Sequence, residues 1–316
     1  MISNKYSILL YIVLLISVYA CSSSRSPRPS EDPVKTVVRL PAGIKRVVVT
    51  ADLHGDFESS KKLFKALKII DENNNWNASD TLWIQTGDIF DRGDGERQII
   101  ELIQKLREQA GKSNSRIVTL IGNHEIMNFR SQFKTTTKGG LKAWDCPPGI
   151  NPVVKDPAWK GRACAFRIGG PISRFYEKSP VIYKEAGLLL THAGVLPKHL
   201  TYGIERLNRE TNEWLAGKGE FPEMLEKRDS PVWTRFYAKA EMSKRCRVLN
   251  ETLKKTDSDI LIVGHSVQTP AIGSFCNGKL WLIDGGLNYR YGTGKVQGLE
   301  ITPQKIRVVT SENKIK

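Results

Sequence analysis

Short apolar runs that end in small clusters of polar residues recur along this chain and limit the folds that it can adopt. Residues 46–50 are followed by Ala51-Asp52-Leu53-His54, residues 81–85 by Thr86-Gly87-Asp88, and residues 117–121 by Gly122-Asn123-His124. The β-branched and apolar content of these runs predicts strands. Between them, residues 59–70 and 99–106 place apolar side chains at helical spacing. Alternating strands and helices predict an α/β fold of consecutive strand–helix–strand units.

The second half of the chain contains further strand-like runs. Residues 187–191 lead into His192-Ala193-Gly194, and residues 259–263 lead into Gly264-His265. Helical spacing is present in residues 204–215 and 236–253. The last apolar runs, 271–276, 279–284, 297–302 and 305–310, predict an antiparallel meander.

Residues 131–177 interrupt this regular order. They are rich in Gly, Pro, Lys and Trp and show no clear hydrophobic period. A long irregular segment inside a compact domain is usually functional, so we expect an insertion near the mouth of the site.

The histidines indicate where the chemistry lies. Four of the five directly follow a predicted strand: His54, His124, His192 and His265. His199 matches no such cluster and is expected in an exposed loop. Open α/β folds bind ligands beyond the carboxyl ends of their strands, so these side chains are expected to meet there, around Asp88.

The residue types at the strand ends predict a metal site. Imidazole and carboxylate donors suit Mn, Fe or Zn. The candidate donors are Asp52, His54, Asp88, Asn123, His192 and His265. This set suffices for two metal ions if one carboxylate bridges them, and Asp88 lies between the other clusters in sequence. Two such ions can hold the attacking oxygen and the phosphoryl oxygens of an in-line displacement.

The N-terminal residues predict export. Lys5 precedes an apolar run, Ile8 to Ala20, of the length of a signal-peptide core, so residues 1–20 are expected to be a signal peptide. Val18-Tyr19-Ala20-Cys21 resembles a bacterial lipobox, which predicts a membrane-anchored lipoprotein with a lipidated Cys21. Ordinary cleavage after Ala20 is the alternative and would give a periplasmic or secreted protein. A Ser/Pro-rich tether (21–42) then leads into a catalytic domain (43–312).

The charge balance limits the partners only loosely. Lys and Arg total 48 against 33 Asp and Glu, a formal net charge of +15, so the surface attracts anions. Nucleic acid, anionic lipid and phosphorylated substrate are all compatible with this charge, and so is a solvated basic surface without a dedicated partner. Because the basic residues are spread along the chain and no nucleic-acid motif accompanies them, no specific nucleic-acid binding is predicted.

Four cysteines follow the tether: Cys146, Cys164, Cys246 and Cys276. In an oxidising compartment this even number allows disulfides. A bridge from Cys146 to Cys164 would close a short loop and stabilise the fold by about 3 kcal/mol in the loop-entropy model. None of the cysteines has Cys-x-x-Cys spacing, which argues against a zinc site built from thiolates.

Five polar clusters, taken together and in this order, resemble the calcineurin-like metallophosphoesterase superfamily and its phosphoprotein phosphatase branch. The clusters are Asp52-x-His54-Gly55-Asp56, Gly87-Asp88-x-x-Asp91-Arg92-Gly93, Gly122-Asn123-His124-Glu125, His192-Ala193-Gly194 and Gly264-His265. Residues 82–91, 231–237 and 282–286 are most similar to the Shewanella-like protein phosphatases. The resemblance implies a four-layer α/β fold, with two central mixed β-sheets flanked by helices and a dinuclear metal site at the strand ends.

This chain departs from the family pattern in two places. Ala51 replaces the usual Gly before Asp52, which is expected to perturb the tight turn there, since Gly reaches backbone angles that Ala avoids. Asp284-Gly285-Gly286 replaces the usual Asp-Thr-Gly. Neither change removes a metal ligand.

The resemblance also implies roles for individual residues. Asp52, His54 and Asp88 would bind one metal ion, and Asp88, Asn123, His192 and His265 the other. A hydroxide shared by the two ions would attack phosphorus. His124 would be the general acid, oriented by Asp91, and Arg92 and Asn123 would bind the phosphate. Arg235 is either a second phosphate clamp or a surface residue.

Three functions remain open on the sequence alone. The first is hydrolysis of phosphoproteins, at phospho-Ser or phospho-Thr and also at phospho-Tyr. The second is hydrolysis of small phosphoesters or dinucleoside polyphosphates. The third is an anchored binding protein on an inactive scaffold, against which the complete set of metal donors argues.

Overall fold

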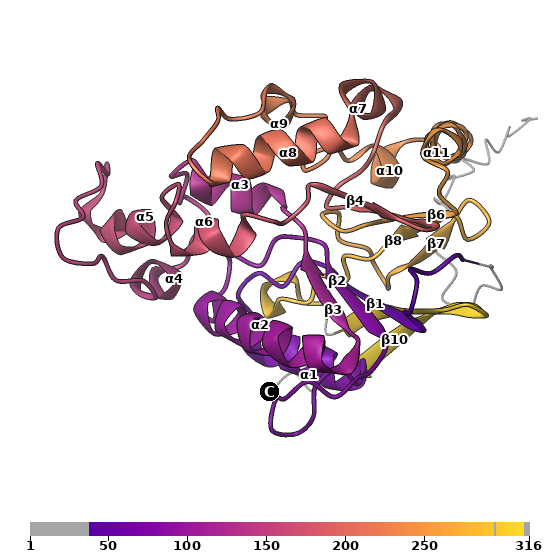
Figure 1. Cartoon of the computed structure of the whole chain (residues 1–316), viewed down its shortest axis with the longest axis horizontal. Helices are drawn as coiled ribbons and strands as arrows, with labels where there is room; N and C mark the ends of the chain where they lie inside the picture. The colour runs from indigo at the N-terminus through magenta and orange to yellow at the C-terminus, as the bar shows by residue number, and fades with distance from the viewer. Residues whose placement is uncertain (1–37, 294, 313–316) are drawn as a thin grey trace, which may run out of the picture.

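The computed structural model describes residues 38–293 and 295–312. The expected signal peptide, Cys21 and the tether up to residue 37 lie outside the described residues. Within the described ranges, no helix is both long and apolar enough to cross a membrane. This part of the chain forms two five-stranded sheets with helices around them (Figure 1).

The first sheet has the strand order β10-β9-β1-β2-β3. Its strands are β1 (Arg46–Thr50), β2 (Thr81–Gln85), β3 (Arg116–Thr119), β9 (Lys295–Thr302) and β10 (Lys305–Glu312). Strands β1, β2 and β3 are parallel, and the antiparallel hairpin β9–β10 is added beside β1. The predicted strand–helix–strand units are therefore present.

The second sheet has the strand order β4-β5-β6-β8-β7. Its strands are β4 (Ile182–Glu185), β5 (Leu188–Thr191), β6 (Ile260–Val263), β7 (Gly273–Phe275) and β8 (Leu280–Leu282). The predicted C-terminal meander is wrong, because β7–β8 and β9–β10 are hairpins in different sheets. Alternating apolar residues mark each strand but do not specify its partner.

The two sheets pack face to face. Val47 and Val49 of β1 lie in one apolar cluster with Leu190 of β5 and Ile262 of β6. Val48 points to the opposite side, as successive residues of a strand do, and packs in a separate cluster with helical residues. Each sheet thus has one face on the other sheet and one face under helices, which confirms the predicted fold class.

Helices cover the outer faces of the sheets (Figure 1). On the first sheet lie α1 (Phe57–Ala66) and α2 (Glu96–Ala110), which ends in the 3-10 turn Gly111–Ser113. Phe64 of α1 and Ile103 of α2 are fully buried in the same cluster as Trp83 of β2. The helices around the second sheet are α7 (Pro197–Tyr202), α8 (Ile204–Leu215), α9 (Glu223–Glu226), α10 (Phe236–Lys239) and α11 (Met242–Thr256).

Two expectations for this helical layer are corrected. The single helix expected over residues 236–253 is divided into α10 and α11, because Ala240 is extended (ψ 149°) and Glu241 caps α11 by accepting the Ser243 N–H. His199 is fully buried in α7 rather than exposed in a loop. Its Nδ1 accepts the N–H of Leu196, and its Nε2 lies 2.8 Å from the carbonyl of Asp229.

Residues 131–177 contain several short helices, joined by irregular stretches such as 143–156. They are α4 (Lys138–Lys142), the 3-10 turn Pro157–Trp159, α5 (Lys160–Phe166) and α6 (Pro171–Tyr176). Helices of three to seven residues are too short to show a hydrophobic period in the sequence. In Figure 1 this segment extends from one end of the molecule, beyond α2 and α3 (Asn123–Phe129).

All four cysteines of the described residues form disulfides. One joins Cys146 to Cys164 on α5, with a Cα–Cα distance of 5.2 Å. The other joins Cys246 on α11 to Cys276 after β7, at 5.4 Å. The first bond ties the loop between α4 and α5 back onto α5.

Candidate active site

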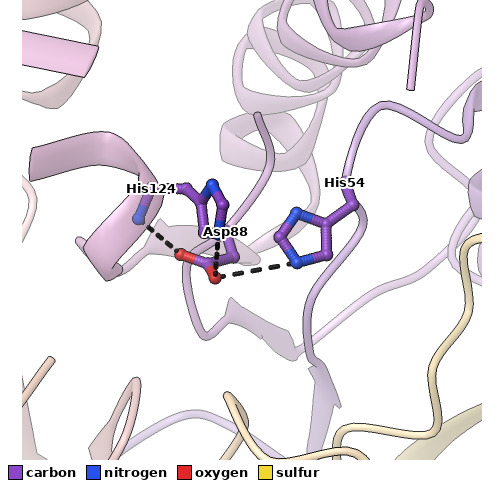
Figure 2. A group of neighbouring side chains, drawn as sticks. All are labelled: His54, Asp88 and His124. Carbon is purple, nitrogen blue, oxygen red and sulfur yellow. Dashed lines mark hydrogen bonds and ion pairs between the residues drawn. The ribbon is translucent and has the colours of Figure 1, made fainter. Parts of the chain in front are cut away.

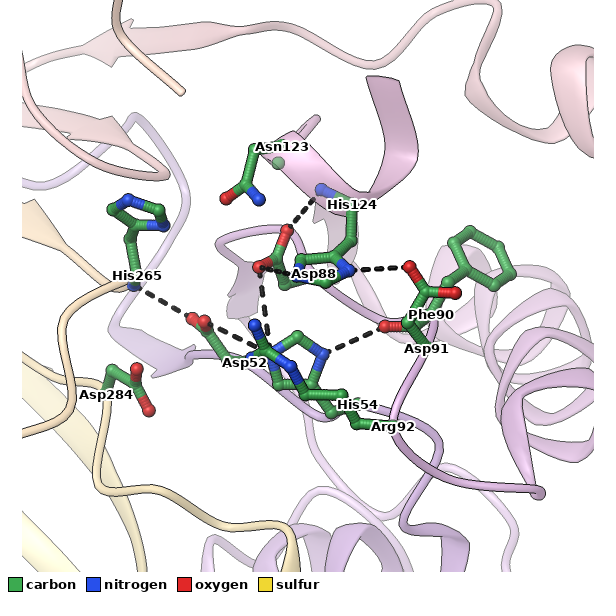
Figure 3. Close-up of polar contacts among 12 residues, drawn as sticks. Asp52, His54, Asp88, Phe90, Asp91, Arg92, Asn123, His124, His265 and Asp284 are labelled. Carbon is green, nitrogen blue, oxygen red and sulfur yellow. Dashed lines mark hydrogen bonds and ion pairs between the residues drawn. The ribbon is translucent and has the colours of Figure 1, made fainter. Parts of the chain in front are cut away.

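The polar clusters meet where the carboxyl ends of strands from both sheets come together (Figure 3). The loop after β1 supplies Asp52 and His54, and the loop after β2 supplies Asp88. Helix α3, which follows β3, begins with Asn123 and His124. The loops after β5 and β6 supply His192 and His265. Each of these side chains is buried, with at most 7% of its surface exposed. The structure therefore brings together the whole predicted set of metal donors.

Asp88 lies at the centre of this cluster (Figure 2). Its Oδ2 is 3.3 Å from His192 Nε2, 3.7 Å from His54 Nε2 and 3.9 Å from His124 Nε2. Two groups of candidate ligand atoms share it: Asp88 with His54 and His124, and Asp88 with His192 and His265. Asp88 belongs to both groups, the position that the sequence predicts for a bridging ligand, although the first group contains His124 where the prediction has Asp52.

The three histidines of the donor set are oriented by backbone carbonyls. His54 Nδ1 lies 2.9 Å from Phe90 O, His192 Nδ1 3.0 Å from Thr86 O, and His265 Nε2 3.2 Å from Trp233 O. An N–H that donates to each carbonyl leaves the other ring nitrogen free as a ligand. Burial lowers the pKa of His54 to about 3 and that of His265 to about 2, so both rings are neutral near pH 7.

The buried carboxylates of the site favour the binding of positive charge. Burial, together with the neighbouring carboxylates, raises the pKa of Asp52 well above its usual value. Burial also raises the pKa of Asp284 to about 6. Burial lowers the pKa of His192, but the charges of Asp88 and Asp52 outweigh it and raise the value to about 9. Buried carboxylates need cations or hydrogen-bond donors beside them, so bound metal ions fit this donor set.

Asp284 was not predicted as a site residue. It follows β8, is buried, and lies beside Asp52 and His265 (Figure 3). Its Oδ1 accepts the N–H of Gly286 at 2.9 Å. The signal in the sequence was a carboxylate directly after a strand, the same pattern that identified Asp52 and Asp88.

His124 and Asp91 form a buried pair next to Asp88. His124 Nδ1 lies 2.6 Å from Asp91 Oδ2, which leaves Nε2 facing Asp88. Burial raises the pKa of Asp91, but the bonds from His124 and the charge of Arg162 outweigh it and lower the value to about 2. Asp91 is therefore an anion under all ordinary conditions and holds the imidazole in one orientation.

Arg162 supports this pair from α5 and was missed in the sequence. It is fully buried, and its Nη2 lies 3.1 Å from Asp91 Oδ1. It also forms an ion pair with Glu96 at the start of α2. The residues around Arg162 have no period and no motif, so the sequence contains no signal that this arginine is buried.

The two predicted phosphate-binding arginines lie at different places. Arg92 is half-buried, and its Nη1 lies 2.5 Å from His54 Nε2 and contacts the hydroxyl of Tyr291. Tyr291 belongs to the 3-10 turn Tyr289–Tyr291, which the sequence did not indicate. Arg235 is exposed and donates from Nη1 to the carbonyl of His265 at 3.0 Å. It therefore lies at the rim of the cluster.

Glu125 ties two of the loops together. Its carboxylate accepts the backbone N–H groups of Asp88 (2.8 Å), Ile89 (2.9 Å) and Gly122 (2.7 Å). A Cβ on Gly122 would lie 2.3 Å from Asp88 Oδ1, so only glycine fits there. Ala51, by contrast, has no positive φ, so the expected perturbation of its turn is absent.

The backbone of the site is strained at several residues other than glycine. Positive φ angles occur at His54 (44°), Asp88 (58°), Asp91 (68°), Arg92 (65°) and His265 (64°). Each such conformation costs on the order of 1–3 kcal/mol and persists only where surrounding contacts impose it. The loops are thus held in the shape that brings the donors together.

Comparisons with known proteins agree with this geometry. A model of the calcineurin-like phosphoesterase family matches residues 45–269. The chain is 32% identical to Shewanella-like protein phosphatase 2 of Arabidopsis thaliana, over 84% of this chain and 78% of that protein. It is 29% identical to a symmetrical bis(5'-nucleosyl)-tetraphosphatase of Neisseria gonorrhoeae, over 44% of this chain and 42% of that protein.

Among solved structures, the fold resembles a cold-active protein-tyrosine phosphatase from a psychrophilic Shewanella. The TM-score is 0.64 at 20% identity, and the match covers 84% of this chain and 80% of the other. The likeness supports the two-sheet fold described above. With the family match over residues 45–269, it shows that the chain belongs to the calcineurin-like phosphoesterase family and is a phosphoesterase.

Proposed function

We propose that the protein is a metal-dependent phosphoprotein phosphatase, which hydrolyses phosphomonoesters of Ser, Thr or Tyr side chains. The observation that carries this proposal is the buried pair of His124 and Asp91, whose free imidazole nitrogen faces Asp88 at the centre of the donor cluster. Hydrolysis of a phosphoester needs positive charge at the phosphoryl oxygens and a proton for the leaving oxygen. Here the groups for both tasks are neighbours.

The donor set divides into two metal sites that share one carboxylate. Asp52, His54 and Asp88 would hold one ion, and Asp88, Asn123, His192 and His265 the other. When bound, the ions supply the charge that polarises the phosphoryl oxygens and acidifies water. The mixture of nitrogen and oxygen donors suits Mn, Fe or Zn.

The chain's own residues position the substrate and move the proton. His124 carries the proton on Nε2 and delivers it to the leaving oxygen, because Nδ1 is held by Asp91. Arg92 binds the phosphate with its planar set of N–H donors. This role requires its guanidinium to leave His54 Nε2 when that nitrogen binds metal.

Two observations favour phosphoproteins over dinucleoside polyphosphates. The relative named as a protein phosphatase is similar over 84% of this chain, whereas the relative named as a tetraphosphatase is similar over 44%. The chain also keeps Arg92 and Glu125, the residues that complete two motifs of the phosphoprotein phosphatase branch. Both side chains make contacts in the site. Hydrolysis of small phosphoesters or dinucleoside polyphosphates is the alternative that the assay below separates.

The test is a side-by-side assay of the mature protein loaded with Mn. The substrates are phosphoserine, phosphothreonine and phosphotyrosine peptides, p-nitrophenyl phosphate and a dinucleoside tetraphosphate. We expect the highest kcat/KM on a phosphopeptide and loss of activity with a chelator. Asp88→Asn should nearly abolish turnover, because Asn lacks the charge that bridges two cations, whereas the exposed Asp145→Asn should not. Preference for the dinucleotide, or full activity after chelation, would overturn the proposal.

A further inference from the structure

A basic groove of about 710 Å³ begins at the rim of the donor cluster. It runs along α3, α9 and α10 and is lined by four cationic side chains and one acidic one: Arg130, Arg228, Arg235, Lys239 and Glu226. Elsewhere on the surface, many Lys and Arg side chains pair with an acid one helical turn away, as Arg97 does with Glu101. In the groove, by contrast, four cations stand beside a single acidic side chain.

The groove is connected to the site by direct contacts. Arg235 donates to the carbonyl of His265 at 3.0 Å, and the carbonyl of Trp233 lies 3.2 Å from His265 Nε2. On the other wall, Met127 lies in α3 one turn beyond His124. A chain whose phosphate reached the donor cluster would pass directly into this groove.

Three of the four cations of the groove lack an acidic partner among the residues that the structure describes. Only Arg130 forms an ion pair there, with Glu226 at 3.3 Å, and both side chains remain partly exposed. Arg228 and Lys239 are exposed, and their side chains form no hydrogen bond or ion pair with any other residue of 38–293 or 295–312. Two to three positive charges are thus available to a ligand.

The floor of the groove is apolar. Ile126 and Leu225 are buried, and Met127 and Trp233 are partly buried between the cations. Aliphatic surface beside charge suits a polypeptide, which presents acidic and apolar side chains together. The thioether of Met127 also adapts to different apolar partners. A nucleic acid would instead need aromatic faces for successive bases, and this groove offers a single one, Trp233.

We infer that this groove binds an acidic segment of polypeptide that flanks the phosphorylated residue of the substrate. The inference rests on the proposed phosphatase function for placing the phosphate at the donor cluster. Substrates would then carry Asp, Glu or further phosphorylated residues within a few positions of the scissile phosphate. Binding would be driven by charge, so it would weaken as salt screens the groove.

The first experiment measures binding without turnover. A fluorescent Glu-rich peptide that carries no phosphate is titrated with the mature protein, and its anisotropy is recorded. The test variant is Arg228→Gln with Lys239→Gln. The matched control, Lys112→Gln with Lys305→Gln, removes two exposed charges from elsewhere on the surface. We expect the test variant to bind about tenfold more weakly and the control to bind as the wild type does.

The second experiment measures the substrate preference. The ratio of kcat/KM for a phosphoserine peptide with acidic flanks to that for one with Gln flanks should exceed one in the wild type. The test variant should lower this ratio by about the same tenfold factor as its loss of binding. A loss of the same size on p-nitrophenyl phosphate would mean that Arg228 and Lys239 act on the metal site, and would overturn the inference.

The outcomes separate this inference from the proposed function. Equal binding of the Glu-rich peptide and its Gln-substituted counterpart would overturn the inference about the groove, whether or not phosphopeptides are hydrolysed. The wild type could bind the Glu-rich peptide selectively, and the test variant lose this binding, although no phosphopeptide is hydrolysed. That outcome would support the inference about the groove and contradict the proposed function. Tighter binding of an oligonucleotide of equal charge, lost in the same variant, would assign the groove to nucleic acid and overturn the peptide assignment.

Discussion

The carboxylate of Asp91 illustrates how much support a single catalytic group receives. Five side chains from three separate segments bind it: His124, Asn128, Thr135, Thr136 and Arg162. Charge-assisted hydrogen bonds of this kind are stronger than neutral ones, and each fixes the carboxylate further. The imidazole of His124 is therefore positioned by a group that cannot turn.

His124→Asn tests whether this residue is an acid or a metal ligand. We expect metal content close to wild type and a decrease in turnover of roughly 10²–10⁴-fold, the usual contribution of a general acid. The deficit should be larger for a phosphoserine peptide than for p-nitrophenyl phosphate, because an alkoxide needs the proton more than a nitrophenolate does. Equal deficits, or loss of one metal ion per chain, would remove His124 from the acid role.

His199, which is not one of the metal donors, provides a prediction about stability and pH. Burial lowers its pKa to about 4. The unfolded chain therefore binds a proton near pH 6.5 that the folded chain accepts only below about pH 4. Because the unfolded state binds more protons in this window, stability decreases as the pH falls through it.

The measurement compares urea unfolding of the wild type and His199→Gln at about pH 7 and about pH 5. At the lower pH the wild type should lose about 1–2 kcal/mol more of its unfolding free energy than the variant loses, since Gln does not titrate. The same loss in both proteins would mean that His199 does not contribute to the acid sensitivity.

At the scale of single elements, the strands and their polar ends were predictable and the short helices were not. Strand β6 is a continuous apolar run and the buried strand β2 has three apolar residues in succession, and in both cases a donor follows within three residues. The short helices α4 and α5 contain five and seven residues, fewer than a hydrophobic period needs to become visible. Arg162 was missed for this reason, although it contacts Asp91.

Arg162→Lys tests whether this residue of α5 contributes to catalysis. Lys keeps the charge but lacks the planar fork that binds Asp91 and Glu96 together. We expect roughly tenfold slower turnover with normal metal content, and a larger deficit on phosphoserine peptide than on p-nitrophenyl phosphate. In a double variant with His124→Asn the two losses should not add, because both act through one acid. Additive losses would reduce Arg162 to a structural role.

At the scale of the whole molecule, the pairing of distant strands could not be predicted from the sequence. The hairpins β7–β8 and β9–β10 have the same local pattern, yet they join different sheets. Which sheet a strand joins depends on the apolar face that it meets across the core, and that face is formed by residues far away in the chain. The four layers were therefore expected from family resemblance, whereas the strand ends were expected from the residues themselves.

The location of the whole protein depends on the export signal, which remains a prediction. Two disulfides in the described residues are typical of proteins that leave the cytosol, and they leave Cys21 as the fifth cysteine. We propose that Cys21 is lipidated, so Cys21→Ser should move the protein from the membrane fraction to the soluble periplasmic or secreted fraction. A multiply acylated Cys holds firmly because each buried methylene contributes about 0.8 kcal/mol. Unchanged partitioning would favour ordinary secretion.

The positive φ angles at five site residues have a consequence for the evolution of this enzyme. Glycine adopts this left-handed conformation without the steric conflict of a Cβ, so a change such as Arg92→Gly should raise the unfolding free energy by up to about 1 kcal/mol while it weakens phosphate binding. Selection for heat resistance alone would therefore favour inactive sequences at residue 92, whereas buried contacts such as that of Asp91 with Arg162 retain the other four side chains. Libraries screened for melting temperature without an activity assay should accumulate Gly or Asn at residue 92, and sequencing the survivors would show whether they do.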